Sequence, residues 1–471
     1  MEPDHETVTR DYTEVIRRLS WPIKLGYGTG HVLNDICASM WFSYLLVYFH
    51  LVLGFSPLMA GVILLIGQVA DALATPFVGY HSDNSADFWL CRYGKRKTWH
   101  LLGTFCVVFA FPFIFSPCIG CKNAHEWSQL IYYAAFVVIF QFGWASVQIS
   151  HLSLIPDLTP TEHERTELTA IRYSFTVFAN VLVYCIFWAV LHVTSEDSAT
   201  NQIGPKDVSN FQTIVNIGIA VGVIASAIFH IVVKEETSGA VTGASQQRTR
   251  SISELFKDLQ LYKVAALYMS TRLFLNLTQI YVPLYLHETL HMAATSLAII
   301  PLIMYLSSFK ASLIVKYLNS KFGRKIAYTI GVVLALFACG AIKFGHGDFF
   351  VSYGIYPVSL MLGSAGSFML VTSLGITADY IGEKAEGGAF IYGLMSFTDK
   401  LSNGLVVIVI QFLKHKGQSP DYYCNILTFV CGGSALFALI ILLFIKPFQQ
   451  YSAYRNINQE TLDDDNTTIQ S

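Results

Sequence analysis

The feature that most constrains this chain is a series of apolar stretches, each long enough to cross a lipid bilayer. A spanning helix needs about 20 mostly apolar residues. Charged residues make up only 13% of the 471-residue chain, roughly half the share found in soluble globular proteins. We therefore expect an all-α membrane protein of twelve transmembrane helices, at 25–51, 58–81, 99–120, 128–151, 169–193, 211–233, 261–287, 293–318, 326–345, 350–377, 387–413 and 422–446.

One long polar interruption separates these stretches into six and six. A basic turn recurs in each half: RYGKRK at 92–97 follows the second stretch, and KFGRK at 321–325 follows the eighth. This pattern resembles the major facilitator superfamily, in which two six-helix repeats enclose a central substrate path. The predicted organisation is a tail at 1–24, a six-helix bundle at 25–233, a linker at 234–260, a second bundle at 261–446 and a tail at 447–471.

The basic turns and the acidic residues near them are candidates for conformational gating. Asp157 follows the fourth stretch and Asp379 follows the tenth, so they occupy similar places in the two halves. Either residue can serve as a helix cap or as a latch between the halves. The full set of gating candidates is Asp83, Arg92, Gly94, Arg96, Asp157, Gly323, Arg324 and Asp379.

Lysine and arginine concentrate in alternate loops, which is the pattern that sets orientation in a membrane. The N-terminus, the loop at 82–98, the linker and the loop at 316–325 are basic, whereas the loops between them hold only scattered lysines. Both termini are therefore predicted to be cytosolic. The first 20 residues carry several charges and no apolar core, so no cleavable signal peptide is expected.

Polar side chains at helical spacing mark the faces that are predicted to line the substrate path. A charge inside the bilayer is costly, so it usually faces the bundle interior and is paired, neutralised or functional. Single amide, hydroxyl and tyrosine side chains often only join neighbouring helices. The candidate substrate-binding residues are His31, Asp35, Gln148, Arg172, Arg272, Asn276 and Lys400, and the candidate coupling-ion residues are Asp71 and Thr75.

Three segments of the first half carry a family resemblance. YGTGHVLND at 27–35, DALATP at 71–76 and RYGKRKTW at 92–99 resemble the glycoside–pentoside–hexuronide cation symporters, a branch of the major facilitator superfamily that includes bacterial melibiose carriers. The resemblance implies that Asp35 is a substrate-binding carboxylate and that Asp71 is the first carboxylate of the coupling-cation site. It likewise implies that Arg172 and Lys400 are the charged residues of helices five and eleven.

The chain departs from this family at four positions. Thr75 stands where the family has a second cation carboxylate, and Ala74 stands where it has an asparagine. Gln148 and Leu152 replace an aspartate and a tryptophan that bind sugar. Asp71 alone suffices for a proton but not for a well-coordinated sodium ion, and a sugar substrate is disfavoured.

Segments 31–42, 111–121 and 141–146 more closely resemble the vertebrate cysteine importers of lysosomes and melanosomes within the same superfamily. That resemblance implies cysteine as substrate, carried from the cytosol into the lumen of the organelle. From the residues alone, Asp35 suits the ammonium group of a small zwitterion, and Arg272 or Lys400 suits its carboxylate. Proton symport into a lumen about two pH units more acidic would oppose import by about 2.7 kcal/mol. Proton antiport or facilitated diffusion is therefore favoured over symport.

Several weaker signals complete the expectations. Cys118 and Cys121 lie in a non-cytosolic loop, where they are candidates for a disulfide, and Cys424 on the same side is an alternative partner. Tyr454 and Ile457 fit a tyrosine-based sorting signal, which implies sorting adaptors as partners. We expect a monomer in the bilayer, without cofactor, metal or nucleic acid.

Other functions remain open at this point. A sugar or glycoside transporter coupled to protons, or a lysophospholipid transporter, would suit the same branch. A receptor or scaffold that transports nothing is a further alternative, although it would not need buried charges on several helices. The sequence holds no recognisable constellation of nucleophile, base and orienting residue, so an enzyme is not expected.

Overall fold

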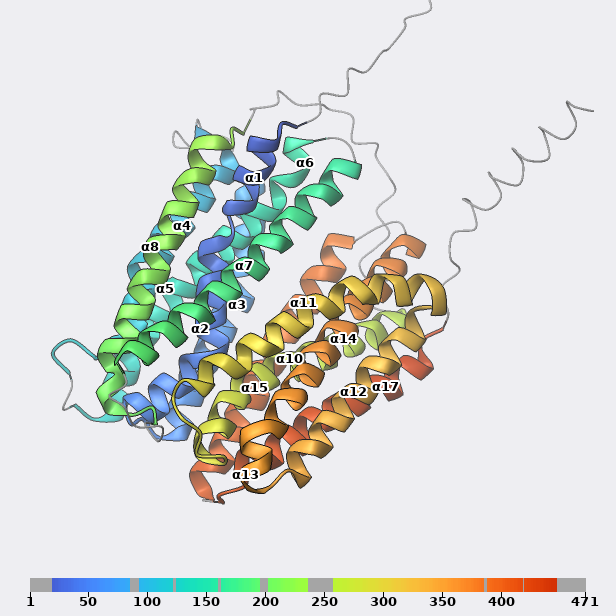
Figure 1. The fold of residues 1–471 in the computed structure, drawn as a ribbon. Helices are drawn as coiled ribbons and strands as arrows, with labels where there is room; N and C mark the ends of the chain where they lie inside the picture. The colour runs from blue at the N-terminus through green and yellow to red at the C-terminus, as the bar shows by residue number, and fades with distance from the viewer. Residues whose placement is uncertain are drawn as a thin grey trace, which may run out of the picture.

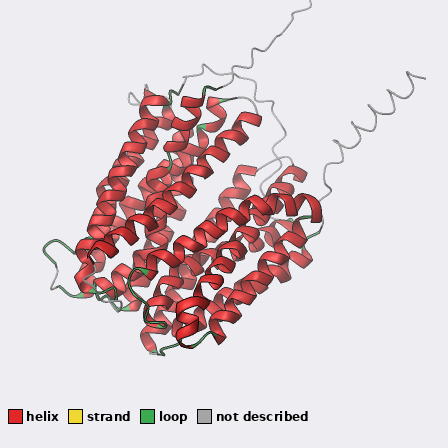
Figure 2. Cartoon of the chain, viewed as in Figure 1, coloured by secondary structure: helices red, strands yellow, loops and turns green. Residues whose placement is uncertain are grey.

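The computed structural model describes residues 19–84, 93–121, 124–159, 162–194, 202–235, 257–384, 388–417 and 419–446. Within these residues the chain is helical, and no strand occurs (Figure 2). In a bilayer every backbone polar group needs a partner, and a helix satisfies its own groups within one segment. The predicted all-α fold class is confirmed.

Among the described residues, the first half contains six long helical stretches, whose arrangement Figure 1 shows. Two of them are interrupted, one between α1 and α2 and the other between α5 and α6. The elements are α1 (Trp21–Thr29), α2 (Val32–Val47), η1 (Tyr48–Val52), α3 (Pro57–Asn84), α4 (Lys95–Ile114), α5 (Glu126–Ser153), α6 (Ile155–Leu158), α7 (Glu162–Thr194), η3 (Pro205–Asp207) and α8 (Val208–Val232).

The second half follows the same plan with shorter connections. Wider π-helical turns, η4 and η5, lie near the starts of two of its helical stretches. The elements are α10 (Leu259–Glu288), α11 (Ser296–Phe322), α12 (Arg324–Phe344), α13 (Gly347–Phe349), η4 (Phe350–Gly354), α14 (Ile355–Lys384), α15 (Gly388–Lys416), α16 (Tyr422–Asn425), η5 (Ile426–Cys431) and α17 (Gly432–Phe444).

Eleven helical stretches among the described residues are long and apolar enough to span a membrane. The one remaining predicted span, at 261–287, coincides with α10, which is 30 residues long. Its hydropathy is lower because it carries Lys263, Arg272 and several amide and hydroxyl groups. Large apolar side chains point outward from the other helices, as expected where lipid is the solvent, including Phe105, Ile131, Ile231, Leu313 and Phe337.

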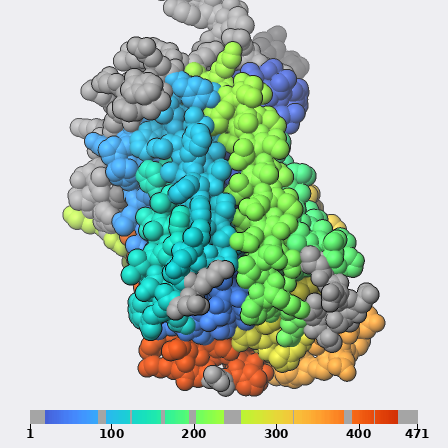
Figure 3. Space-filling model, turned by 90° about the vertical axis from the view of Figure 1, so that its left-hand side faces the viewer, coloured from blue at the N-terminus to red at the C-terminus, as the bar shows by residue number. Residues whose placement is uncertain are grey.

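The helices form two groups that lean against each other. In Figure 1 the ribbons of α1–α8 and of α10–α17 stand further apart at the end that carries α1 and α6 than at the end that carries α13. The groups meet where α3 contacts α15, α7 contacts α11 and α2 contacts α10. Figure 3 shows orange and red atoms of the second half reaching under the first half at the end away from α1. Most of the linker predicted at 234–260 lies outside the described residues.

The glycines of the two basic turns both have positive φ angles. Gly94 and Gly323 have φ angles of 123° and 83°, which favour glycine, and each immediately precedes a helix. After each turn an arginine pairs with an aspartate of its own half. Arg96 Nε lies 2.6 Å from Asp157 Oδ2, and Arg324 Nε lies 2.5 Å from Asp379 Oδ2. These pairs join helices within a half, and neither is a latch between the halves.

Candidate functional site

The break between α1 and α2 places an acidic side chain at a helix N-terminus. A β-carbon at Gly30 would lie 2.6 Å from Phe229 and 2.7 Å from His151, so the close packing at the break requires glycine. α2 begins at Val32, and Asp35 lies in its first turn. The positive end of a helix dipole stabilises a negative charge at this position. The chain therefore provides local electrostatic support for a carboxylate inside the first half.

Asp35 contacts the N-cap residue of its own helix and a residue of α7. Its Oδ1 lies 3.0 Å from His31 Nδ1, and its Oδ2 accepts a hydrogen bond of 2.9 Å from Thr176 Oγ1 on α7. Asp35 and His31 are both buried, with 6% and 5% of their surfaces exposed. The structure therefore brings these two candidate substrate-binding residues into contact.

Arg172 lies one helical turn before Thr176, whose hydroxyl is 3.2 Å from the Arg172 carbonyl oxygen. The Nε atom of Arg172 is buried and has no hydrogen-bond partner among the described residues. The charges of Arg172 and Asp35 both act on His31. A carboxylate and a guanidinium with an available donor therefore lie around the same histidine.

Lys400 forms an ion pair that crosses between the halves. Its Nζ on α15 lies 2.7 Å from Asp71 Oδ1 on α3 and donates a 2.8 Å hydrogen bond to Thr75 Oγ1. Thr75 Oγ1 also lies 3.2 Å from Asp71 Oδ1. The two candidate coupling-ion residues are thus held together with a lysine ammonium among them.

Arg272 is paired as well, with a residue that was not a predicted site residue. Its Nε lies 2.9 Å from Asp399 Oδ2, and Asn276 Nδ2 donates to Asp399 Oδ1 over 3.3 Å. We expected Arg272 or Lys400 to hold the carboxylate of the substrate. In this conformation aspartates already neutralise both cations, and Arg172 is the cation with an available buried donor.

A cavity of about 280 Å³ lies between α7 of the first half and α10, α11 and α14 of the second. Its volume is near the lower limit of the ~300–1,000 Å³ range of ligand pockets. The polar side chains of its lining include Thr176, Asn180, Tyr184, Arg272, Asn276, Gln279 and Tyr305, and most of the remaining lining is apolar. Thr176 therefore connects the cavity to Asp35, and Arg272 connects it to Asp399.

Gln148 does not line this cavity. Its Oε1 accepts a 2.9 Å hydrogen bond from Trp144 Nε1 on the same helix, and the carbonyl oxygen of Trp144 accepts one of 3.0 Å from Asn34. The amide that replaces the family's aspartate thus acts within the first half, beside the helix that carries Asp35.

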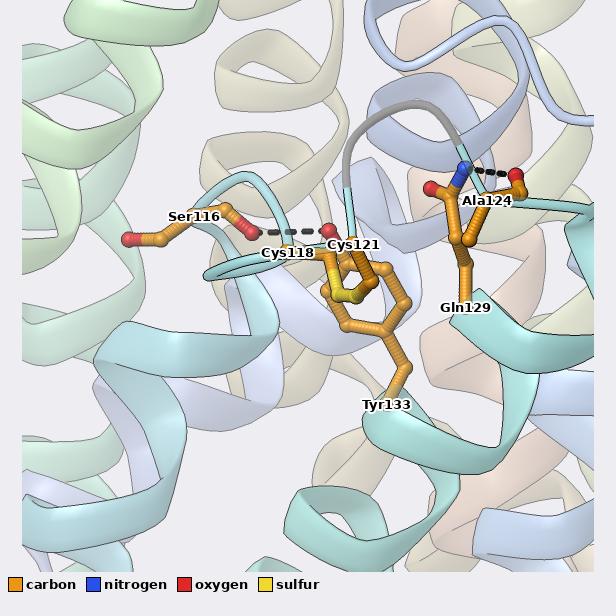
Figure 4. The surroundings of a disulfide bond; sticks show 6 residues. All are labelled: Ser116, Cys118, Cys121, Ala124, Gln129 and Tyr133. Carbon is orange, nitrogen blue, oxygen red and sulfur yellow. Dashed lines mark hydrogen bonds between the residues drawn. A yellow bond between two sulfur atoms is a disulfide. The ribbon is translucent and has the colours of Figure 1, made fainter.

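The cysteine expectations have different outcomes in the structure. Cys118 and Cys121 are joined by a disulfide in the connection between α4 and α5 (Figure 4). Beside it, Tyr133 Oη donates a 2.8 Å hydrogen bond to the Ser116 carbonyl oxygen. Cys424 is not a partner: it is a buried free thiol whose Sγ lies 3.5 Å from the Ile342 carbonyl oxygen. The Cys424 side chain belongs to the buried hydrophobic core.

Four other predicted site residues have side chains outside the described part of the chain. Arg92, Tyr454 and Ile457 fall outside the described residues, and the side chain of Asp83 is also outside them.

Comparisons with known proteins agree on one family. The family described as MFS/sugar transport protein matches residues 26–446. "Major facilitator superfamily domain-containing protein 12" of Homo sapiens is 46% identical over 418 residues, covering 84% of this chain and 86% of that protein. The "Glucuronide carrier protein homolog" of Escherichia coli (strain K12) is 24% identical over 457 residues, covering 91% and 93%.

A solved structure shares the fold at low identity. The crystal structure of a D-xylose-proton symporter superposes with a TM-score of 0.66 at 15% sequence identity. The match covers 91% of this chain and 97% of that one.

Proposed function

The chain belongs to the MFS/sugar transport protein family and is a multi-pass secondary transporter, and from this premise we propose that it carries cysteine from the cytosol into the lumen of lysosomes and melanosomes by alternating access. The observation that carries the proposal is the pairing state of the buried charges. Asp35 and Arg172 surround one histidine, and the Nε atom of Arg172 has no partner among the described residues. Arg272 and Lys400 are already paired with aspartates.

This charge arrangement suits a small zwitterion. Asp35 accepts hydrogen bonds from the ammonium group, and Arg172 donates to the carboxylate, since charge-assisted hydrogen bonds are the strong ones. His31 and Thr176 orient Asp35. Cysteine in particular is favoured by the resemblance of segments 31–42, 111–121 and 141–146 to the vertebrate cysteine importers.

Asp71, Thr75 and Lys400 are the proposed coupling group. In this conformation the Asp71–Lys400 pair holds α3 against α15, so it must break or rearrange when these helices move apart. Protonation of Asp71 would remove one charge of the pair and release Lys400. This supports a proton-linked cycle, in which an acidic lumen favours antiport over symport for import. Facilitated diffusion is the alternative without proton coupling.

Both chain ends are proposed to face the cytosol, with the disulfide-bearing connection in the lumen. The Arg96–Asp157 and Arg324–Asp379 pairs then stabilise the cytosolic ends of the two halves. The tail motif with Tyr454 and Ile457 is proposed to bind sorting adaptors.

Uptake of labelled cysteine into organelles enriched in this protein tests the proposal directly. We expect saturable uptake that unlabelled cysteine competes with, whereas sugars and lysophospholipids do not. Asp35→Asn should abolish uptake at unchanged protein abundance, because an amide cannot hold the ammonium charge. Normal uptake by that variant would refute the assigned role of Asp35.

A lysophospholipid transporter is the second candidate, and the cavity lining favours it. Phe274, Leu275, Met304, Phe309 and Leu362 line the cavity between α7 and α11, and an acyl chain would bind among such side chains. Competition by lysophospholipids, with no uptake of cysteine, would select this function instead.

A further inference from the structure

Three charged side chains from both halves meet at the end of the molecule away from α1 and α6. His50 lies in η1 of the first half, Glu288 is the last residue of α10, and Lys414 lies in the last turn of α15. His50 Nε2 lies 3.2 Å from Glu288 Oε1, and Lys414 Nζ lies 2.7 Å from Glu288 Oε2. The side chains are 23%, 20% and 13% exposed. Water and protons can therefore reach the group, although it is not fully solvated.

The surroundings of His50 determine which protons its ring carries. Its Nδ1 lies 3.0 Å from the Phe55 carbonyl oxygen, which only accepts hydrogen bonds. Its Nε2 faces the Glu288 carboxylate, which also acts as an acceptor because Lys414 holds it as an anion. A neutral imidazole has one N–H and one lone pair, so it would turn a lone pair toward one of these oxygens. Both contacts are favourable only when His50 is the imidazolium.

The neighbouring segments hold this geometry. Glu126, at the start of α5, accepts hydrogen bonds from the Ser56 hydroxyl and backbone over 2.9 and 3.3 Å, which fixes the loop that presents the Phe55 carbonyl. On the second half, Lys414 Nζ lies 5.3 Å and 4.8 Å from the ring centres of Tyr422 and Tyr423. These cation–π contacts favour the observed position of Lys414 beside Glu288.

Besides Glu126, Tyr422 and Tyr423, two histidines are titratable groups near this cluster. His287, the residue before Glu288, interacts electrostatically with Glu288, His50 and His291. Among the described residues of the first half, none forms an ion pair with His287 or His291, so protonating either histidine adds charge near Glu288 without joining the halves. His50 is the member of this set that belongs to the first half.

We propose that His50, Glu288 and Lys414 form a proton-binding latch that joins the two halves at this end and opens when His50 loses its proton. Under the orientation given in the proposed function, this end faces the organelle lumen. Luminal protons then bind at His50, close the luminal side and favour the conformation that is open to the cytosol. An acidic lumen would thus favour the conformation that binds substrate from the cytosol. The proton responsible would bind at His50, a site separate from Asp71.

Linkage sets the direction of the pH dependence. The latched state contacts the imidazolium and the unlatched state does not, so acid favours latching, and the latch is lost as the pH rises. The unperturbed value for histidine, about 6.5, lies between the pH of an acidic lumen and that of the cytosol. Above the midpoint, the ratio of latched to unlatched protein falls by up to about tenfold per pH unit.

The distance between spin labels across this end tests the latch without any substrate. Labels are attached through unnatural amino acids at Ser128 on α5 and Lys416 on α15, both exposed, in the full-length protein in lipid nanodiscs. We expect a short, narrow distance distribution at pH 5 and a longer one at pH 7.5. Failure of cysteine transport would leave this test intact, since it requires no transported molecule.

Matched variants separate a latch from a passive ion pair. His50→Gln should remove the pH dependence, whereas His192→Gln, at an exposed histidine near the same end of α7, should keep the midpoint of the unsubstituted protein. His50→Arg should hold the short distance at both pH values, and Glu288→Gln should give the long distance at both. An unchanged midpoint in His50→Gln, or no pH dependence in the unsubstituted protein, would overturn the proposal.

Discussion

The cationic residues in the interior differ in whether a carboxylate of the protein neutralises their charge. Lys400 and Arg272 each contact an aspartate at less than 3 Å. Removing one partner of such a pair strongly destabilises the folded protein. Arg172 is different, because its buried Nε atom has no partner among the described residues. A donor that stays unsatisfied in the protein alone is costly, and a ligand carboxylate would satisfy it. Stability and substrate affinity should therefore respond differently at the two arginines.

Paired substitutions at these arginines test the distinction. Arg172→Gln should raise the apparent KM for cysteine by about 10- to 100-fold, since a hydrogen bond to a charged group contributes about 1.5–3 kcal/mol. Its unfolding temperature in detergent should change little. Arg272→Gln should lower that temperature, because it leaves Asp399 buried without its cation. Equal losses of stability in the two variants would contradict the assignment of Arg172 to the substrate.

Helical spacing could predict which charged residues face the interior but not which of them pair. Asp35 and His31 are four residues apart on one helix, and that pair was within reach of the sequence. Asp71 and Lys400 come from different halves, and no local pattern relates them. Asp399 precedes Lys400 directly, and consecutive helical residues point in different directions. The adjacent charges of Asp399 and Lys400 therefore indicated that Asp399 has a partner of its own. They did not indicate that this partner is Arg272.

Among the helical elements, α4 and α12 show how a repeated turn can acquire different neighbours. Both helices follow a glycine with positive φ. At α4, the carboxylate of Glu235 accepts hydrogen bonds from the backbone amides of Arg96 and Lys97 over 3.2 and 3.0 Å. These amides have no partner within the helix, so the carboxylate acts as its N-terminal cap. A β-carbon at Gly94 would lie 2.4 Å from Glu235 Oε2, whereas none of the described atoms lies within 4 Å at Gly323.

Alanine at the two glycines should separate backbone strain from crowding. Gly323→Ala should destabilise the protein by about 1 kcal/mol, from positive φ alone. Gly94→Ala should cost roughly 1 kcal/mol more, because the new methyl group displaces the capping carboxylate. Thermal unfolding of both variants in detergent measures the difference. If the two losses are equal, Glu235 is not an effective cap.

Apolar length was sufficient to place the helices, because a bilayer admits few other structures. The interruptions within helices were less accessible. The break between α1 and α2 depends on the packing of Gly30 against Phe229 and His151, and these residues are 121 or more positions away. The π-helical turns likewise carry no motif that distinguishes them from the adjoining helix.

Over the whole molecule, the two halves are joined at two levels. The central level contains the Lys400–Asp71 pair and a 3.3 Å hydrogen bond from Gln279 to Ser43. The other level contains His50 and Glu288. The halves also meet where α3 packs closely against α15. A β-carbon at Gly61 on α3 would lie 2.9 Å from Gln411 Cβ on α15. Because helices that touch so closely leave no spare volume, an added side chain there must push the halves apart.

Valine at Gly61 should therefore act on the whole molecule. We expect Gly61→Val to lower transport at least tenfold and to reduce stability by about 1–3 kcal/mol. Gly433→Val on α17 is the matched control, since no described atom would lie within 4 Å of its β-carbon. Uptake assays and thermal unfolding of the two variants give the comparison. Similar transport by both would mean that the α3–α15 contact is not needed during the cycle.

The modest hydropathy of α10 also has a consequence for how the protein is made. An arginine near the centre of a helix opposes insertion into a membrane by about 2.5–3.5 kcal/mol, and α10 carries Arg272. The aspartate that neutralises it is 127 residues further along the chain. At a synthesis rate of about 5–20 residues per second, the arginine waits roughly 6 to 25 seconds for its partner. During biogenesis α10 must therefore be sheltered by helices already in the bilayer, and the Arg272–Asp399 pair forms only when α15 arrives.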